Sequence, residues 1–188
     1  MDEIFKNSAY RILELFIEHP SKDYSVRGMA RELRISHATV IRYISDLLKL
    51  ALVKKRVDTL YPAYYADTGS QHYMQYKRSH MIFKITRSGL ISHLKEKTLA
   101  SSIILFGSCA KGSYNENSDI DLFVEAKEQG FDRKKYEKSL GKDINLLFEP
   151  NINNLSRELR NNILNGVVLA GFAKIGGMSG NGSFTKNG

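Results

Sequence analysis

The sequence predicts an α+β protein in two parts: an N-terminal helical region that ends in a β-hairpin, and a small α/β region behind it. Three observations predict this fold. Apolar residues recur at helical spacing through the first fifty residues, and two short alternating segments follow them. Beyond a long helical stretch, two apolar strands frame a Gly-Ser turn and a pair of aspartates. A chain of 188 residues is long enough for two small domains.

Composition narrows the class of protein. The chain is 42% hydrophobic and 26% charged, and no apolar run approaches the roughly 18 to 20 residues that a membrane span needs. The N-terminal segment is acidic and amphipathic, unlike a signal peptide. Cys109 is the single cysteine, so the chain cannot form an internal disulfide. We therefore expect a soluble, cytoplasmic protein.

The net charge of +8 is concentrated in the middle of the chain. Residues 69–99 hold 6 lysines and arginines against 1 acid, whereas residues 1–68 hold 11 against 9 and residues 100–188 hold 11 against 10. A positive field attracts nucleic acids or nucleotides. The alternative is an ordinary solvated helix face, because basic surfaces are common.

The first region has the pattern of three helices. Apolar residues over residues 3–18 follow helical spacing. Ser25 is expected to cap a second helix over residues 26–33, and Ser36 to cap a third that runs to about residue 50. A turn of about three residues separates the second helix from the third, which is the spacing of a helix-turn-helix.

Two short strands follow, at residues 52–57 and 61–65, around Asp58-Thr59-Leu60. Three helices and a basic hairpin resemble the winged-helix family over residues 1–67. In such a domain one helix enters the DNA major groove and the hairpin touches phosphates. The resemblance implies DNA contacts from Ser36, His37, Thr39, Arg42 and Tyr43 of the helix and from Lys54, Lys55 and Arg56 of the hairpin. The alternative role is protein docking or dimerisation, because the first 68 residues carry little net charge.

Residues 68–98 are expected to form a connecting helix. This stretch contains no proline, and its apolar residues follow helical spacing for most of its length. Gly89 is expected to bend or interrupt the helix. His72, His80 and His93 are scattered rather than set at metal-ligand spacing, so we interpret them as core or surface residues.

The two apolar strands of the second region frame residues that suit phosphate chemistry. Residues 101–106 form the first strand, and Gly107-Ser108 then lead into a short helix near Cys109, whose free N–H groups favour an anion. On the next strand Asp119 and Asp121 share one face, about 6 to 7 Å apart along the chain. A divalent cation relieves the repulsion between such carboxylates, and Mg²⁺ commonly shares its ligands with substrate phosphates. The pattern predicts nucleotidyl transfer.

The same residues resemble a known family. Gly107-Ser108, then Gly112, then Ser118-Asp119-Ile120-Asp121-Leu122 match the G-S-x-A-x-G…S-D-I-D-L pattern of the DNA polymerase beta-like nucleotidyltransferases, whose small branch is called the minimal nucleotidyltransferases. The resemblance covers residues 99–175 and implies a mixed sheet. It implies that Gly107, Ser108 and Lys111 bind a nucleoside triphosphate, with ATP expected, and that Asp119 and Asp121 hold Mg²⁺ or Mn²⁺.

The sequence departs from the family at its third acidic position. Asn145 occupies the place of an aspartate that normally acts as general base or shared metal ligand. An amide oxygen can ligate a metal but cannot accept a proton at neutral pH. Asp143 lies on the same strand face, but replacing the missing carboxylate would require a shift of about 6 to 7 Å. General-base help is worth about 10²- to 10⁴-fold, so Asn145, at the third catalytic position, predicts slow catalysis or a nucleotide-binding relic.

The C-terminal part is expected to hold a helix over residues 152–165, a short buried segment over residues 167–172 and a flexible tail over residues 176–188. Only about 65 residues follow the aspartate strand, which leaves little room for a small-molecule acceptor pocket. We therefore expect a macromolecular acceptor, and the family suggests a protein partner such as the toxin of a toxin–antitoxin pair.

A second hypothesis comes from a different class. The chain would be a DNA-binding transcription regulator whose degenerate nucleotidyltransferase domain only senses nucleotide. Asn145 and the helix-turn-helix spacing favour this alternative. The sequence leaves the acceptor, the base preference and homo-oligomerisation open.

Overall fold

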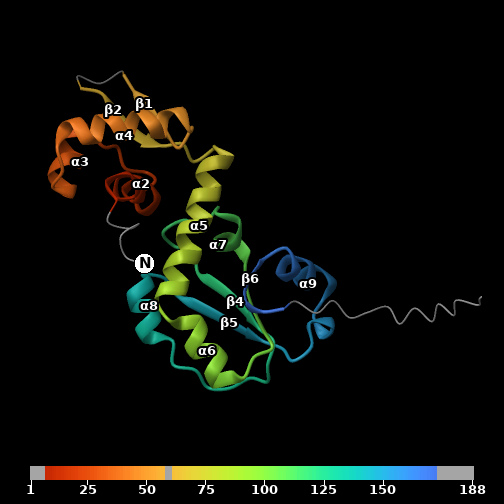
Figure 1. The fold of residues 1–188 in the computed structure, drawn as a ribbon. Coiled ribbons are helices and arrows are strands. Elements are labelled where there is room, and N and C mark those ends of the chain that lie inside the picture. The colour runs from red at the N-terminus through yellow and green to blue at the C-terminus, as the bar shows by residue number, and fades with distance from the viewer. Residues whose placement is uncertain (1–6, 58–60, 173–188) are drawn as a thin grey trace, which may run out of the picture. The chain divides into compact units, whose positions relative to one another are not determined.

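The computed structural model describes residues 7–57 and 61–172 (Figure 1). The chain divides into two compact units, residues 1–81 and 82–188, and each is described by itself below. The division falls inside helix α5 (Gln71–Arg87), so the chain passes from one unit to the next within a helix. The domain limits expected at residues 67, 98 and 175 stay predictions.

Among the residues that the structure describes, the first unit contains three helices and a two-stranded sheet before α5 begins, as the sequence predicted. Its elements before α5 are α2 (Ser8–Glu18), α3 (Val26–Leu33), α4 (His37–Lys49), β1 (Val53–Arg56) and β2 (Ala63–Ala66). Both predicted caps are confirmed: the Ser25 hydroxyl accepts a hydrogen bond from the Gly28 N–H at 3.0 Å, and the Ser36 hydroxyl accepts one from the Thr39 N–H at 3.1 Å. These bonds satisfy N–H groups that have no partner within the helix.

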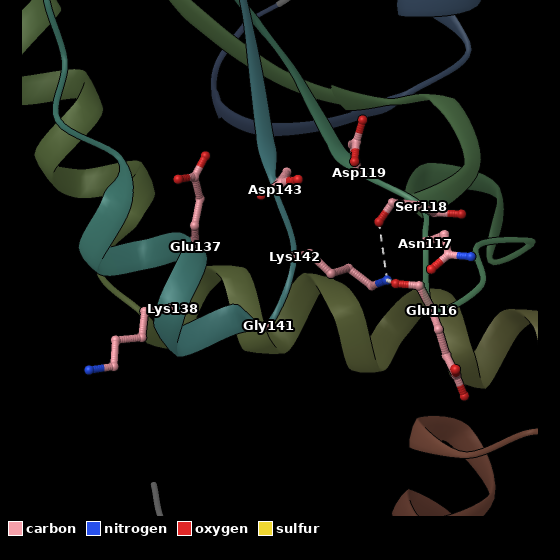
Figure 2. Close-up of a pocket in the computed structure, with 9 residues that line it drawn as sticks. All are labelled: Glu116, Asn117, Ser118, Asp119, Glu137, Lys138, Gly141, Lys142 and Asp143. Carbon is pink, nitrogen blue, oxygen red and sulfur yellow. Dashed lines mark hydrogen bonds between the residues drawn. The ribbon is translucent and has the colours of Figure 1, made fainter.

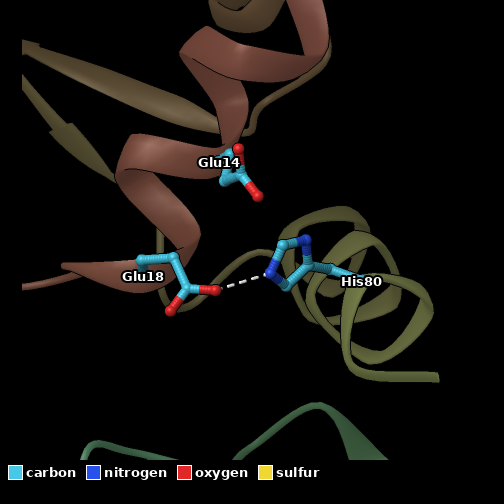
Figure 3. A group of neighbouring side chains, drawn as sticks. All are labelled: Glu14, Glu18 and His80. Atoms are coloured by element: carbon cyan, nitrogen blue, oxygen red, sulfur yellow. Dashed lines mark hydrogen bonds and ion pairs between the residues drawn. The ribbon is translucent and has the colours of Figure 1, made fainter. Parts of the chain in front are cut away.

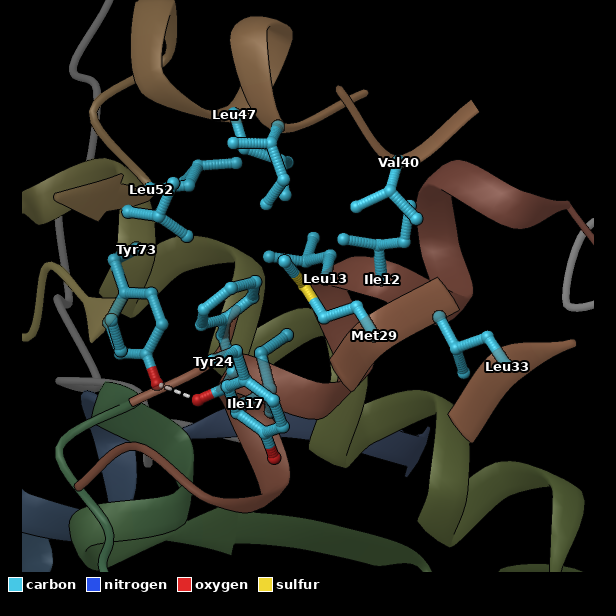
Figure 4. Close-up of a cluster of buried hydrophobic side chains, with 14 of the residues drawn as sticks. Ile12, Leu13, Ile17, Tyr24, Met29, Leu33, Val40, Leu47, Leu52 and Tyr73 are labelled. Carbon is cyan, nitrogen blue, oxygen red and sulfur yellow. Dashed lines mark hydrogen bonds between the residues drawn. The ribbon is translucent and has the colours of Figure 1, made fainter. Parts of the chain in front are cut away.

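The hairpin and the helices share one core. β1 pairs antiparallel with β2, with Val53 opposite Ala66, and Tyr24 forms an isolated bridge with Tyr64. The predicted turn at Asp58-Thr59-Leu60 lies outside the described residues. Figure 4 shows the buried side chains, which include Ile12, Leu13, Met29, Val40, Leu47 and Leu52. The Tyr73 hydroxyl donates to the Phe16 carbonyl at 2.8 Å, so α5 is fastened to α2.

Up to residue 172, the second unit contains one mixed four-stranded sheet in the order β5-β4-β3-β6. β4 (Ile120–Val124) pairs parallel with β5 (Ile144–Phe148), and β3 (Ser102–Phe106) pairs antiparallel with β4 and with β6 (Val167–Gly171). The helices of this unit are the last part of α5 and then α6 (Leu90–Thr98), α7 (Gly107–Lys111), α8 (Lys134–Leu140) and α9 (Arg157–Leu164). The sheet is therefore mixed, as expected.

Strand alternation separates the two faces of this sheet. Ile104 and Phe123 point to one face and form a buried cluster with Ile152 and Ile163, so α9 and the turn before it cover this face. Leu105 and the other alternate residues of β3 and β4 point to the opposite face and are also fully buried. Because Asp119, Asp121 and Phe123 alternate on the same side, the aspartates continue the face that α9 covers.

Five local features differ from the sequence expectations or refine them. Gly89 interrupts the predicted connecting helix, with φ +76°, and separates α5 from α6. Helix α7 begins at Gly107 rather than near Cys109. The helix predicted over residues 152–165 is wrong in its first part, because a 3₁₀ turn ends at Asn154 and Ser156 caps α9. Helix α8 was not predicted, and the short buried segment expected at residues 167–172 is a strand, Val167–Gly171, that is only half-buried.

Within the described ranges, no helix combines the length and the apolar character that a bilayer crossing requires.

Candidate active site

The site is built at one end of the central strands, where β4 and β5 bring their polar residues together beside the end of β3. Asp119 directly precedes β4, and Asp121 is its second residue. In the strand register Asp121 lies opposite Phe106 of β3 on one side and opposite Asn145 of β5 on the other. The three positions singled out in the sequence, Asp119, Asp121 and Asn145, are therefore neighbours in space.

A single amide group links the two carboxylates. The Asn145 Nδ2 donates to Asp119 Oδ2 at 3.1 Å and to Asp121 Oδ1 at 3.1 Å. Both aspartates are half-buried, whereas Asn145 is exposed. Hydrogen bonds to charged groups are stronger than neutral ones, and an N–H that points at a carboxylate reduces the repulsion between the two acids. The amide thus holds two like charges together.

Gly107 is required where it stands. Its φ is +70°, a conformation that side chains disfavour, and a Cβ added to it would collide with Asp121 Oδ2. The backbone of the Gly-Ser turn therefore lies against the Asp121 carboxylate. The sequence pointed to this glycine for its approach to a phosphate, and the structure shows a close approach to Asp121.

Ser108 and Lys111 lie on the short helix α7 that follows this glycine. The Ser108 side chain is half-buried, and its hydroxyl forms no hydrogen bond with another residue of the described ranges. Lys111 is exposed in the last turn, and the described part of the chain offers it no ion-pair partner. Both side chains remain predicted nucleotide ligands.

The loop that leads to Asp119 is held by a lysine. The Lys142 Nζ donates to the carbonyl oxygens of Asn115 at 2.6 Å, of Ser118 at 3.1 Å and of Glu116 at 3.3 Å. The buried Cys109 thiol donates to the Asp119 carbonyl at 3.2 Å, which fits its interpretation as a packing residue. Lys142 therefore holds the backbone that precedes Asp119, and Cys109 holds the Asp119 carbonyl itself.

A pocket of about 490 Å³ opens beside Asp119 (Figure 2). Residues 116–119, 137–138 and 141–143 line it. Asp143 is exposed in this pocket, and its carbonyl accepts the Ile120 N–H at 2.9 Å. Asp143 thus faces the pocket, whereas Asn145 bonds to both aspartates, so the two candidates for the third catalytic position lie in different surroundings.

The donor set fits a divalent cation. Each carboxylate uses one oxygen for the Asn145 amide, and rotation of that amide would present its oxygen instead. The amide nitrogen already occupies a place between the two acids, which shows that a positive or proton-donating group can be accommodated there. Mg²⁺ prefers two such carboxylates and leaves other positions to water or phosphate.

Comparisons with known proteins agree with this geometry. The family model described as a nucleotidyltransferase domain matches residues 87–167. A protein of Methanocaldococcus jannaschii named "Putative protein adenylyltransferase MJ1379" is 38% identical over an alignment of 69 residues, and the match covers 32% of this chain and 69% of that protein. The chain belongs to the nucleotidyltransferase family. No solved structure gave a significant match. The nucleotidyltransferase match begins before residue 99, so it includes α6, which the sequence had assigned to the connector.

The residues predicted to touch DNA lie in the first unit and are in part engaged with one another. The hydroxyls of Ser36 and Thr39 are 2.8 Å apart, and Arg42 stacks on the Tyr43 ring. His37 is the first, exposed residue of α4. These helix positions remain a prediction.

The predicted hairpin cations differ in their partners. Lys54 forms an ion pair with Asp67 at 2.9 Å, and this hydrogen bond and charge raise the pKa of Lys54. Arg56 is 3.4 Å from Asp23. Lys55 is exposed and has no acidic partner among the described residues. Contact of these three cations with DNA phosphates stays a prediction.

Sequence reasoning missed one group of side chains. Glu14, Glu18 and His80 lie together in the first unit, although His80 had been interpreted as a core or surface residue. His80 is indeed buried. The spacing of the two glutamates, one helical turn apart, was the available signal, but nothing in the sequence shows that a histidine 62 residues beyond Glu18 joins them.

Proposed function

We propose that the second unit transfers a nucleoside monophosphate from a nucleoside triphosphate, with ATP as the expected substrate, to a hydroxyl group of a protein acceptor. The observation that carries the proposal is the Asn145 amide bonded to Asp119 and Asp121 beside the Gly107-Ser108 turn. The name of the related archaeal protein supports adenylyl transfer to protein. The winged-helix role of the first unit and a toxin partner are further parts of the proposal.

In this mechanism Asp119 and Asp121 would hold Mg²⁺ or Mn²⁺, which would neutralise phosphate charge and orient the triphosphate. The backbone at Gly107 and the Ser108 hydroxyl donate to the terminal phosphates, and Lys111 adds a positive charge. Asn145 keeps the two carboxylates at a fixed separation. The acceptor hydroxyl attacks the α-phosphorus, and pyrophosphate leaves. Asn145 cannot take the hydroxyl proton, so water or a group on the acceptor receives it.

The experiment separates adenylyl transfer from other uses of ATP. Purified protein and a candidate acceptor are incubated with Mg²⁺ and ATP that is labelled at either the α- or the γ-phosphate. Label is expected on protein only from α-labelled ATP, and it should disappear in Asp119→Asn and Asp121→Asn. Glu128→Gln, which removes an exposed carboxylate on a loop, is the matched control and should keep the activity. Label from γ-labelled ATP would show phosphoryl transfer and contradict the proposal.

A second candidate function is a transcription regulator that senses nucleotide without turning it over. The absence of a carboxylate at position 145 favours it, as do the three helices and basic hairpin of the first unit. This protein would bind Mg²⁺·ATP but label no acceptor, and nucleotide would change its affinity for duplex DNA. Fluorescence anisotropy with labelled DNA, with and without Mg²⁺·ATP, distinguishes the two functions.

A further inference from the structure

Two carboxylates and a buried imidazole converge within the first unit (Figure 3). Glu14 and Glu18 are one turn apart on α2, so they share a helix face. His80 reaches them from α5. The candidate ligand atoms of the three side chains all lie within 4.8 Å of one another. Two helices that are far apart in the sequence therefore offer one nitrogen and two oxygen donors to the same point.

The imidazole is fixed at both nitrogens. The His80 side chain is 1% exposed, and its Nε2 lies 2.7 Å from Glu18 Oε1. Its Nδ1 lies 2.7 Å from the Tyr10 hydroxyl. A histidine that ligates a metal usually donates its other ring N–H to an oxygen, which fixes the tautomer and the ring orientation. Donation from Nδ1 to the Tyr10 oxygen would leave the Nε2 lone pair on the side of the two glutamates.

Glu14 supplies an independent observation. Its carboxylate is half-buried but forms no hydrogen bond or ion pair with any other residue in the described ranges. Removing a carboxylate from water is unfavourable unless the group is paired or coordinates a metal. An unpaired carboxylate that faces a buried imidazole is therefore suited to a cation that both groups can bind.

We propose that Glu14, Glu18 and His80 bind a transition-metal dication of the Zn²⁺ type, with Tyr10 orienting the imidazole. Imidazole with carboxylates suits Zn²⁺, whereas Mg²⁺ prefers oxygen ligands alone. Water completes the coordination.

Binding requires only a small adjustment of the ligands. Ligand atoms at Zn²⁺ are roughly 3.5 Å apart in a tetrahedron, from bond lengths of about 2.0 to 2.2 Å. Side-chain rotation of Glu14 and of the exposed Glu18 can bring the donors together. The bound ion would link α2 to α5 and so stabilise the unit that carries the predicted DNA-binding helix. This site does not depend on the proposed nucleotidyl transfer.

The test uses the full-length chain with Asp119→Asn and Asp121→Asn, which removes the acids of the other site. Isothermal titration should show one Zn²⁺ bound per chain. Glu14→Gln and His80→Gln should each weaken binding at least tenfold, and Tyr10→Phe should weaken it by about 10- to 100-fold as an orienting partner. His72→Gln, an exposed histidine on the same helix, is the matched control and should leave the affinity unchanged.

Co²⁺ provides a spectroscopic readout of the same ligands. Its visible absorption bands should appear at one equivalent and change when His80 is replaced. Absence of stoichiometric Zn²⁺ binding, or equal affinity in wild type, Glu14→Gln and His80→Gln, would overturn the proposal. Glu14→Gln keeps the side-chain size and breaks no described contact, so it decides the question even if His80→Gln does not fold.

Discussion

Asn145 lies directly opposite Asp121 across the parallel pairing of β4 with β5, and its amide nitrogen donates to the Asp121 carboxylate at 3.1 Å. The same nitrogen reaches Asp119 at 3.1 Å. The residue that departs from the family pattern is therefore at the centre of the site. An aspartate at this position would place three negative charges together, whereas the asparagine keeps two of them bridged without a cation.

Asn145→Asp is expected to make the site more dependent on metal. Without metal, a third carboxylate adds electrostatic repulsion to the site. With metal bound, it supplies a further ligand and a general base, so pyrophosphate release in the presence of acceptor should rise by about 10²-fold. Mn²⁺ should bind more tightly, and the melting temperature in EDTA should fall. Asn161→Asp adds the same charge on the exposed face of α9 and serves as the control.

The alternative is that Asp143 is the general base, and the same experiment tests it. If Asp143 already acts as the base, Asn145→Asp will change little and Asp143→Asn will abolish turnover. Asn145 bonds to both aspartates, whereas Asp143 is exposed in the pocket. These positions favour the outcome in which Asn145→Asp raises pyrophosphate release. A wild-type rate that neither substitution alters would contradict both assignments.

Asp119→Asn and Asp121→Asn are expected to weaken Mg²⁺-dependent ATP binding greatly while the fold stays intact. Each substitution removes a metal ligand, but it also removes carboxylate repulsion, so the free energy of unfolding in EDTA should not decrease. Isothermal titration with Mg²⁺·ATP measures the first effect, and urea unfolding the second. Unchanged affinity in both variants would exclude these aspartates as the metal site.

Gly107→Ala should be more destabilising than its backbone conformation alone explains. The left-handed conformation costs an alanine about 1 to 2 kcal/mol, and the new Cβ must also displace the Asp121 carboxylate. Gly89→Ala is a matched control, because Gly89 has φ +76° but open space around its Cβ position. Urea unfolding should show a larger loss of stability for Gly107→Ala than for Gly89→Ala. Titration with Mg²⁺·ATP should show a loss of binding for Gly107→Ala alone.

The hairpin cations should contribute unequally to DNA binding. Lys54 and Arg56 already face acids, so Lys55→Ala alone is expected to reduce the slope of log affinity against log salt by about 1. Replacing all three with alanine should lower affinity for every sequence, whereas Arg42→Ala should alter sequence preference. Anisotropy titrations over a range of salt concentrations measure both effects. An intact protein that does not bind duplex DNA would favour protein docking instead.

The first unit should lose stability at alkaline pH. Burial, with a smaller effect of Glu32, raises the pKa of Tyr24 to about 12, and burial also raises the pKa of Tyr73. The folded state therefore favours the neutral phenols. Their contribution to the free energy of unfolding is complete below about pH 10 and is lost as the pH rises toward 12. Urea unfolding at pH 8 and pH 11, followed by circular dichroism, tests this sign.

Tyr73→Phe separates the effect of the hydroxyl group from that of the aromatic ring. It removes the hydrogen bond to Phe16, worth about 1 kcal/mol at pH 8, but it should reduce the further loss between pH 8 and pH 11. Tyr76→Phe, on an exposed position of the same helix, should change neither value. An equal alkaline loss in all three proteins would show that Tyr73 does not contribute.

Local patterns predicted the elements whose determinants lie within a few residues. The Ser25 and Ser36 caps were correct because a cap depends on one side chain and the next turn. The aspartate face of β4 followed from strand alternation. Helix α8 was missed because its apolar residues are few; only Tyr136 and Leu140 are buried in it. The sequence pattern predicts one continuous helix over residues 152–165. Ser156 instead caps a new helix at this point, so α9 begins only after it.

Non-local relationships could not be predicted from spacing. The sequence placed Asn145 at the third acidic position, but its two hydrogen bonds arise from the parallel register of β4 and β5, which no local pattern specifies. The contact between Gly107 and Asp121 likewise requires the antiparallel register of β3 and β4. The cluster around His80 requires the packing of α5 on α2.

The strand order also sets when the site can exist during synthesis on the ribosome. Asp121 has one neighbour on β3, which is made earlier, and another on β5, which ends at residue 148. A nascent chain that has exposed both aspartates therefore still lacks Asn145, and the acids repel one another until β5 emerges. The carboxylate pair is thus assembled late, and a chain that stops before β5 carries both aspartates without the amide that joins them.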